Sequence, residues 1–331
     1  MPQNQAREAS QNHQESSGEG NLNLGQRAGE SDGAVLGARD THQILFVSGK
    51  GGVGKSLIAA SIALEEVRKG RRVLLVEIGD ISYYKDFWNL PNVRYQPTRT
   101  VHGFDVALWS GDTALREYVL YYLKLEKIYS VFFENKVMRS LINVAPGLNE
   151  IAILGKITSG IRKVGPAMDY DLIVVDCYAT GHALSLLQAP KGMMEAIQIG
   201  PMGHHSREIE NVLRNPKICG YIVVTLLEEM PVVETLDFCR SLKAELGIDC
   251  QVIANRVLNV PVSREDLLKI ESVDPAGMGE FAKYLVFIAD RQGDFLQALR
   301  KEMSQIKCVP LIFSNDPDQL VVQAGEALRK A

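Results

Sequence analysis

The sequence predicts an α/β protein built on a doubly wound, mostly parallel β-sheet, with an inserted helical subdomain. From residue 43 onward, short runs rich in Val, Ile and Leu alternate with helix-sized segments. Such runs are typical of parallel strands that helices cover on both faces. In addition, a glycine-rich segment joins the first strand directly to the first helix. Together these observations indicate a doubly wound sheet.

The individual elements follow from the same pattern. The predicted strands are 43–48, 72–77, 105–109, 171–176, 220–226, 250–255 and 309–313. Two clear helices are 57–69 and 232–246. Gly70 and Gly247 follow them directly, and glycine accepts the left-handed conformation that commonly ends a helix.

Two longer stretches do not fit simple alternation and predict a helical subdomain over the carboxyl ends of the strands. The first is about 113–165, with a turn at 145–147. The second is 184–213, which Pro190 and the Gly-Pro pair at 200–201 are expected to interrupt. No internal repeat is present, so the sequence predicts one folded unit and no tandem duplication.

Residues 1–40 differ in composition from residues 41–331, which form the predicted domain. They are rich in Gln, Asn, Ser, Gly and Glu and contain no aromatic residue, so they predict a disordered tail. The tail has no apolar core of a secretory signal, and no later run reaches the roughly 18 apolar residues of a membrane span. We therefore expect a cytoplasmic protein. The net charge of −4 argues against general nucleic-acid binding.

The pattern of the cysteines predicts a structural role and gives no sign of a catalytic or metal-binding one. Their number is odd, they form no C-x-x-C pair and most lie in apolar segments: Cys177, Cys219, Cys239, Cys250 and Cys308. Buried, reduced thiols are the expected state in this setting.

The glycine-rich segment after the first strand matches the phosphate-loop pattern G-x-x-x-x-G-K-[ST]. In this pattern, backbone N–H groups surround the phosphates, Lys55 neutralises the β- and γ-phosphates, and the Ser56 hydroxyl is a Mg²⁺ ligand. The segment thus predicts Mg-ATP as the ligand. The predicted contact residues are Gly49, Gly51, Gly52, Val53, Gly54, Lys55 and Ser56.

A second lysine, Lys50, stands inside this loop. It is either a solvated surface residue or a cation that acts on the nucleotide of a facing subunit, as an arginine finger does. The sequence K-G-G-V-G-K-S resembles the deviant Walker A loop of a class of dimeric ATPases. The resemblance implies that Lys50 contacts nucleotide across a dimer, which is a homodimer or a heterodimer with a paralogue.

The strand 171–176 ends in Asp176, the place of a Walker B carboxylate that holds Mg²⁺ through water. The chain continues as C-Y-A-T-G-H-A-L and reaches Pro190. This resembles the D-T-A-P-T-G-H-T-L…P switch II of the ArsA-like family, which joins arsenite-pump ATPases with tail-anchored-protein targeting ATPases. The matching residues are Asp176, Thr180, Gly181 and His182, whereas Cys177 and Tyr178 depart. The resemblance implies a nucleotide contact at Gly181.

Three further segments extend the resemblance. They are A-P-G-L-N-E with L-G-K-I at 145–157, V-T-L-L-E-E-M-P-V-V-E-T at 224–235, and I-A-N-R-V at 253–257. Asn255 occupies the place of an asparagine that reads the adenine edge in the family. Considered alone, an asparagine at a strand end is more often a turn or cap residue.

Switch I departs from the family pattern S-T-D-P-A-H-N-L. A gapless alignment places Gly79 where the family has the acid that positions the attacking water, and Asp80 follows one residue later. Hydrolysis is therefore slow, uses Asp80 or Glu77, or depends on a partner subunit. The alternative is a weakly or non-hydrolysing regulatory partner of a catalytic paralogue.

The helical stretches carry apolar side chains that fit either a core or a groove for a hydrophobic protein segment or membrane-protein client. They are Tyr118, Tyr121, Tyr122, Leu125, Tyr129, Phe132, Phe133, Met193, Met194 and Met202. The zinc-binding C-x-x-C of eukaryotic targeting ATPases and a recognisable arsenite site are both missing. A partitioning ATPase that acts on DNA or membrane is a weaker third possibility.

Overall fold

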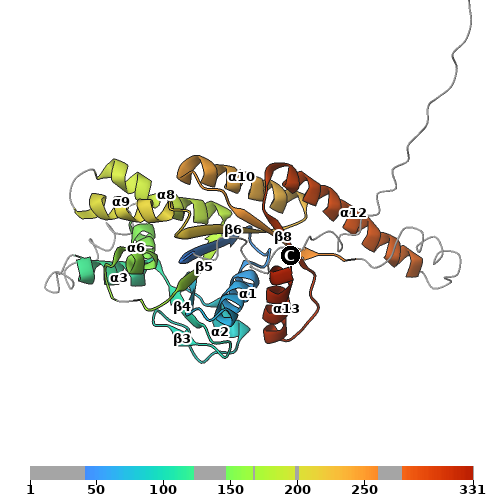
Figure 1. Cartoon of the computed structure of the whole chain (residues 1–331), viewed down its shortest axis with the longest axis horizontal. Coiled ribbons are helices and arrows are strands. Elements are labelled where there is room, and N and C mark those ends of the chain that lie inside the picture. Colours follow the sequence, from blue (N-terminus) through green and yellow to red (C-terminus); the bar gives the residue numbers. More distant parts are fainter. Residues whose placement is uncertain (1–41, 123–146, 167, 198–200, 260–277, 331) are drawn as a thin grey trace, which may run out of the picture. The chain divides into compact units, whose positions relative to one another are not determined.

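The computed structural model describes residues 42–122, 147–166, 168–197, 201–259 and 278–330 (Figure 1). An eight-stranded sheet forms its centre, in the order β3-β4-β2-β5-β1-β6-β7-β8. The strands are β1 Ile44–Gly49, β2 Val73–Ile78, β3 Thr98–Arg99, β4 Asp105–Trp109, β5 Leu172–Ala179, β6 Cys219–Leu226, β7 Gln251–Val257 and β8 Ile306–Pro310. Neighbouring strands pair in parallel, except that β3 is antiparallel to β4. The predicted fold class is confirmed.

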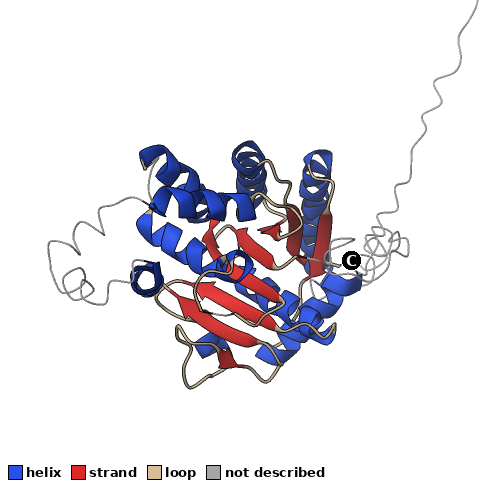
Figure 2. Ribbon diagram, turned by 60° about the vertical axis from the view of Figure 1, so that its left-hand side comes forward, coloured by secondary structure: helices blue, strands red, loops and turns tan. Residues whose placement is uncertain are grey.

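Helices cover both faces of this sheet (Figure 2). The described helices are α1 Lys55–Arg68, α2 Tyr83–Phe87, α3 Gly111–Tyr122, α6 Leu148–Ile157, α7 Ser159–Arg162, α8 Thr180–Ala196, α9 Pro201–Leu213, α10 Glu229–Leu246, α12 Met278–Glu302 and α13 Pro317–Lys330. α1 and α13 lie side by side on one face, and α8, α9 and α10 lie on the other (Figure 1). None of the described helices is long and apolar enough to cross a membrane.

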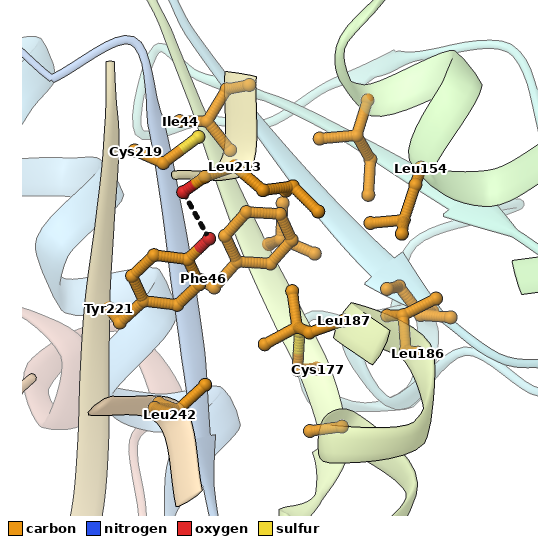
Figure 3. Packing of buried hydrophobic residues seen from close by; sticks show 14 of the residues in the cluster. Ile44, Phe46, Leu154, Cys177, Leu186, Leu187, Leu213, Cys219, Tyr221 and Leu242 are labelled. Atoms are coloured by element: carbon orange, nitrogen blue, oxygen red, sulfur yellow. Dashed lines mark hydrogen bonds between the residues drawn. The ribbon is translucent and has the colours of Figure 1, made fainter. Parts of the chain in front are cut away.

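The core has two halves because successive side chains of a strand point to opposite faces of the sheet. On β1, Ile44 and Phe46 face the layer of α6, α8 and α10, whereas Leu45 and Val47 face α1 and α13. Figure 3 shows the first half, where the rings of Phe46 and Tyr221 stack with centroids 5.3 Å apart. The buried strands are thereby fixed on both faces, which holds their carboxyl ends rigidly in place.

Three boundaries differ from the sequence prediction. The last strand is Ile306–Pro310, since Leu311 and Ile312 leave the sheet and line a cavity instead. The short strand β3 was not predicted, because two residues leave no period to detect. Helix α8 runs through Pro190, whose ring is buried in the helical layer, so tertiary packing outweighs the local tendency of proline to end a helix.

The predicted helical subdomain corresponds to α3, α6, α7, α8 and α9, with residues 123–146 outside the described part of the chain. Its buried side chains join the same hydrophobic cluster as one face of the sheet. Tyr118 and Met193 belong to that cluster, so these two residues are core and the groove hypothesis is wrong for them. Tyr121 is about half exposed, at 48%. The side chains of Tyr122, Leu125, Tyr129, Phe132 and Phe133 lie outside the described residues, as does the predicted tail 1–40.

The prediction of reduced cysteines needs one correction. Cys177 and Cys219 are buried thiols and Cys308 is partly buried. Cys239 and Cys250 instead form a disulfide, with their Cα atoms 6.1 Å apart. The sequence did not indicate this pair, because the turn after α10 brings the helix back beside the residue that precedes β7.

Candidate nucleotide-binding site

The loop Lys50–Gly54 leaves the carboxyl end of β1 and enters α1 at Lys55. β1 lies between β5 and β6 near the middle of the sheet, where the order of the strands along the chain changes direction. In doubly wound sheets, ligands bind at this edge and at this switch point. The location therefore matches the binding chemistry that the loop sequence predicts.

Two glycines of the loop are required by close approach and by backbone conformation. A Cβ atom at Gly49 would lie 2.1 Å from the carbonyl oxygen of Val224, and one at Gly54 would lie 2.4 Å from Asn255 Nδ2. Gly54 also has a φ of 93°, which side-chain-bearing residues rarely adopt. The loop can hold this path only with glycine at both positions.

Lys55, Ser56 and Asp176 come together where the loop meets the helix. Lys55 Nζ donates to the backbone oxygen of Lys50 at 3.3 Å, across the loop. Ser56 lies close to the Asp176 carboxylate of the neighbouring strand β5. Burial raises the pKa of Asp176, while Ser56, the hydrogen bond from Tyr84 and the charge of Lys55 oppose that shift. The carboxylate is thus held within reach of the loop's hydroxyl and its lysine.

A cavity of about 500 Å³ opens beside this group. Gly52, Gly54, Ser56 and Asn255 line its polar side. Its apolar side is built by Leu57, Tyr83, Phe87, Pro310, Leu311, Ile312 and Leu320. Small-molecule sites usually have such a mainly apolar wall with a few polar groups, and volumes of roughly 300–1,000 Å³. The cavity is large enough for a nucleotide.

Asn255 reaches this cavity, but it also holds the phosphate loop. Its Nδ2 donates to the carbonyl oxygen of Val53 at 2.9 Å, and its Oδ1 accepts from the backbone N–H of Arg256 at 2.9 Å. The side chain is buried, with 3% exposed. An amide nitrogen carries two hydrogens and the bond to Val53 uses one. The contact between the second hydrogen of Asn255 Nδ2 and the adenine base stays a prediction.

The second loop lysine does not line the cavity of its own chain. Lys50 Nζ lies 2.7 Å from Glu234 Oε1 on α10, and both side chains are about one-third exposed, at 34% and 36%. Glu234 falls in the 224–235 segment, where the sequence did not single it out. The cross-subunit role of Lys50 remains a prediction.

The two switch I acids are placed very differently. Neither Asp80 nor Glu77 lines the cavity, and Asp80 is exposed. Glu77 is buried, and it lies opposite Asp176 in the pairing of β2 with β5. Its Oε1 accepts the backbone N–H of Tyr83, whereas its Oε2 has no hydrogen-bond partner among the described residues. Burial is the main cause that raises the pKa of Glu77, and the nearby charge of Asp176 adds to it.

Gly181 lies in the first turn of α8, which follows β5 without an intervening loop. It is exposed and does not line the cavity, so its predicted nucleotide contact is neither supported nor contradicted by position alone. The first backbone N–H groups of a helix have no partner within the helix, and such ends suit phosphate.

Sequence reasoning missed one residue of the site entirely. The hydroxyl of Tyr84 on α2 lies 3.0 Å from Asp176 Oδ2 and 3.0 Å from the backbone oxygen of Ser56. No motif marks this tyrosine, and an aromatic residue in a short helix is ordinarily core. Only its burial at 0% exposure, with its hydroxyl beside the Asp176 carboxylate and the Ser56 carbonyl, reveals the contact.

The parallel sheet, the glycine loop at its switch point, and the adjoining serine and aspartate define a P-loop ATPase. A family model described as anion-transporting ATPase matches residues 42–202. The chain is 32% identical to ATPase BagA of Mycobacterium tuberculosis over 238 residues, which is 68% of each chain. It belongs to the ArsA-like ATPase family.

More distant relatives carry two other names. A putative arsenical pump-driving ATPase of Halobacterium salinarum is 27% identical over 231 residues, which cover 65% of this chain and 35% of the relative. An ATPase ASNA1 homolog of Plasmodium chabaudi chabaudi is 26% identical over 264 residues, 70% of this chain and 66% of the relative. The resemblance that the motifs indicated is confirmed.

Proposed function

We propose that the protein binds Mg-ATP in the cavity beside Gly49–Ser56 and hydrolyses it to ADP and phosphate. The observation that carries this proposal is the meeting of Lys55, Ser56 and Asp176 at the end of β1. The loop's backbone N–H groups and Lys55 supply the positive potential that a triphosphate needs.

Mg²⁺ fits the donor set at this point. Ser56 offers a hydroxyl and Asp176 a carboxylate, and oxygen donors of this kind are what Mg²⁺ takes, together with water and substrate phosphate. When bound, the ion would neutralise charge on the β- and γ-phosphates. Ser56 and Asp176 lie close enough for Ser56 to lower the pKa of the Asp176 carboxyl, so the two oxygen donors are adjacent.

Glu77 is the best candidate for orienting the attacking water. Phosphoryl transfer to water depends on positioning and on charge stabilisation, with no covalent enzyme intermediate. Glu77 Oε2 is buried, lacks a hydrogen-bond partner among the described residues, and stands on the strand beside Asp176. Because Glu77 does not line the cavity, nucleotide binding would have to open a place for water between this carboxylate and the terminal phosphate. Asp80, which is exposed, fits this role less well.

The dimer part of the proposal rests on Lys50. Its ammonium group is bound to Glu234 and does not line its own cavity, so a nucleotide in a facing subunit is the more accessible target. In this view, the Lys50 ammonium group leaves Glu234 and binds a phosphate of the partner's nucleotide. This change of partner couples ATP binding to association of the subunits. The facing subunit is a second copy or a paralogue.

ATP-driven closure would then act on a client or partner through the helices that follow switch II. β5 carries Asp176 and continues directly into α8, so a shift at the phosphate is transmitted to α8 and to α9, which packs on it. A hydrophobic protein segment or membrane-protein client remains the proposed partner. Because Met193 and Tyr118 are core, the docking residues must be other ones.

A specific observation also favours a second function, a regulatory subunit with weak or no hydrolysis. Gly79 stands where an acid is expected, and its φ of 155° and missing side chain leave that position without a carboxylate. Such a subunit would bind nucleotide and complete the site of a catalytic paralogue.

Single-turnover release of phosphate separates the two functions. Purified protein in excess over labelled ATP should release phosphate, and the Lys55→Ala variant should serve as the blank. Tight nucleotide binding without release above that blank would contradict hydrolysis by the protein alone and would favour the regulatory function. Release that begins only on addition of a paralogue would place the catalytic group in the partner.

A further inference from the structure

Tyr84 occupies an unusual place for a tyrosine with no motif around it. Its side chain is fully buried at 0% exposure, and its hydroxyl oxygen lies 3.0 Å from both Asp176 Oδ2 and the backbone oxygen of Ser56. A phenol has one hydrogen, so it can donate to one of the two acceptors at a time. An ionised carboxylate is the stronger acceptor, and such charge-assisted bonds are roughly twice as strong as neutral ones.

The ring of Tyr84 is held in place by α2 and its surroundings. It stacks on Trp88 with centroids 5.2 Å apart and an interplanar angle of 17°, and it meets Tyr83 edge to face at 5.4 Å. The helix itself is fixed at its start, where Ser82 Oγ accepts the Lys85 N–H at 3.1 Å and Glu77 accepts the Tyr83 N–H. The hydroxyl is thus aimed at Asp176 before any ligand arrives.

We infer that Tyr84 is a positioning residue for the metal ion of the ATPase site, and that it links metal binding to switch I. Its hydroxyl lies 3.0 Å from one oxygen of Asp176, and its ring is held by Trp88 and Tyr83, so the rigid phenol constrains the orientation of the carboxylate. Partners that orient a metal-binding group commonly contribute about 10–100-fold to metal affinity. The inference rests on the proposed binding of Mg-ATP.

The link to switch I follows from the single hydrogen of the phenol. A cation bound through Asp176 holds the carboxylate in one orientation, which keeps the single phenol hydrogen on Asp176 Oδ2 and away from the Ser56 carbonyl. Because Tyr84 is rigidly part of α2, the change is felt by the whole helix and by Glu77 at its start. Tyr84 would therefore report the presence of the metal to the segment that orients water.

The test compares Tyr84→Phe with Tyr221→Phe. Tyr221 is the matched control because it is also a buried tyrosine. Its hydroxyl donates to the Leu213 carbonyl oxygen at 2.9 Å in the core, and no role at the nucleotide site is assigned to it (Figure 3). Both changes remove one buried hydroxyl and keep the ring. Thermal melts establish that the two variants are folded and how much each is destabilised.

Two affinities are then measured for the wild type and both variants. Mn²⁺ binding in the presence of ATP is followed by electron paramagnetic resonance, and binding of a fluorescent ATP analogue is followed in EDTA. Tyr84→Phe should weaken Mn²⁺ binding at least about tenfold and leave the metal-free nucleotide affinity unchanged. Tyr221→Phe should leave both affinities unchanged.

Equal losses with and without metal, or unchanged Mn²⁺ binding by Tyr84→Phe, would overturn the inference. Failure of the wild type itself to bind Mn²⁺ with ATP would instead contradict the proposed function. Should Tyr84→Phe not fold, 3-fluorotyrosine at position 84 in the otherwise unaltered chain provides a second measurement. Its ¹⁹F resonance should move when Mg²⁺ is added to the ADP complex, and the same label at 221 should not; no metal-dependent shift at 84 would also overturn the inference.

Discussion

The phosphate loop and switch I occupy similar places in the fold but differ in how well they match the expected sequence pattern. Each follows a buried strand, β1 or β2, at the same edge of the sheet, and each turns at a glycine, Gly49 or Gly79. The phosphate loop keeps every residue of its pattern, whereas switch I has Gly79 where the expected pattern has an acid. The acid proposed to take its place, Glu77, stands inside the strand and two residues earlier.

The difference follows from the chemistry of the two segments. A phosphate is held largely by backbone N–H groups along one continuous path, so the local sequence must permit that path. A water molecule needs only one acceptor at the right point in space, and any nearby strand can supply it. Phosphate binding therefore requires a continuous sequence motif, whereas orientation of water requires only an acceptor at one position in the folded protein.

The largest effect is expected where the pattern is intact. Lys55→Ala should weaken ATP binding about 100-fold or more, because hydrogen bonds to charged groups contribute roughly 1.5–3 kcal/mol each and Lys55 faces a highly charged triphosphate. Equilibrium titration with a fluorescent ATP analogue measures the loss. Lys217→Ala, at an exposed turn before β6, is the matched control and should bind normally. Unchanged ATP affinity in Lys55→Ala would contradict the assignment of Gly49–Ser56 as the phosphate-binding loop.

An intermediate effect should separate the two switch I acids. Glu77→Gln should bind ATP but hydrolyse it at least about tenfold slower, a rise of about 1.4 kcal/mol in the barrier. Asp80→Asn should stay within about twofold of the wild type, as exposed substitutions usually do. Single-turnover phosphate release measures both variants. The reverse order would show that Asp80 moves inward in the nucleotide complex, and two normal rates would assign the acceptor to a partner subunit.

The smallest effect is expected for Glu234→Gln, which removes the charge on α10 that pairs with Lys50 of the loop. Surface ion pairs contribute roughly 0.2–1 kcal/mol, so Glu234→Gln should favour ATP-dependent dimerisation by no more than about fivefold. Lys50→Ala should abolish that dimerisation while leaving ATP binding to the single subunit intact. Sedimentation velocity with ATP and with ADP checks both changes. Weaker association in Glu234→Gln would mean that Glu234 itself contacts the partner.

Local sequence patterns were sufficient to predict most of the fold and the phosphate-loop part of the candidate site. Apolar runs located β1, β2, β4, β6 and β7 to within two residues of their observed ends, and they located β5 except that it runs on to Ala179. The loop Gly49–Ser56 and the strand-end acid Asp176 were identified in the same way, since each depends on residues adjacent in sequence. The boundaries that failed, at β8 and at Pro190, are those where packing against distant elements overrides local preference.

The sequence by itself therefore determined the α/β class, the phosphate loop and the family, because these are properties of short continuous segments. Tertiary structure alone decided that Glu77 and not Asp80 faces Asp176, that Tyr84 contacts both Asp176 and Ser56, and that Lys50 pairs with Glu234. The partners in these contacts are as far apart as 184 residues along the chain. They meet because the strand order places β2, β5, β1 and β6 side by side, so distant residues share one sheet edge. Contacts of that kind leave no periodicity or spacing in the chain from which they could be read.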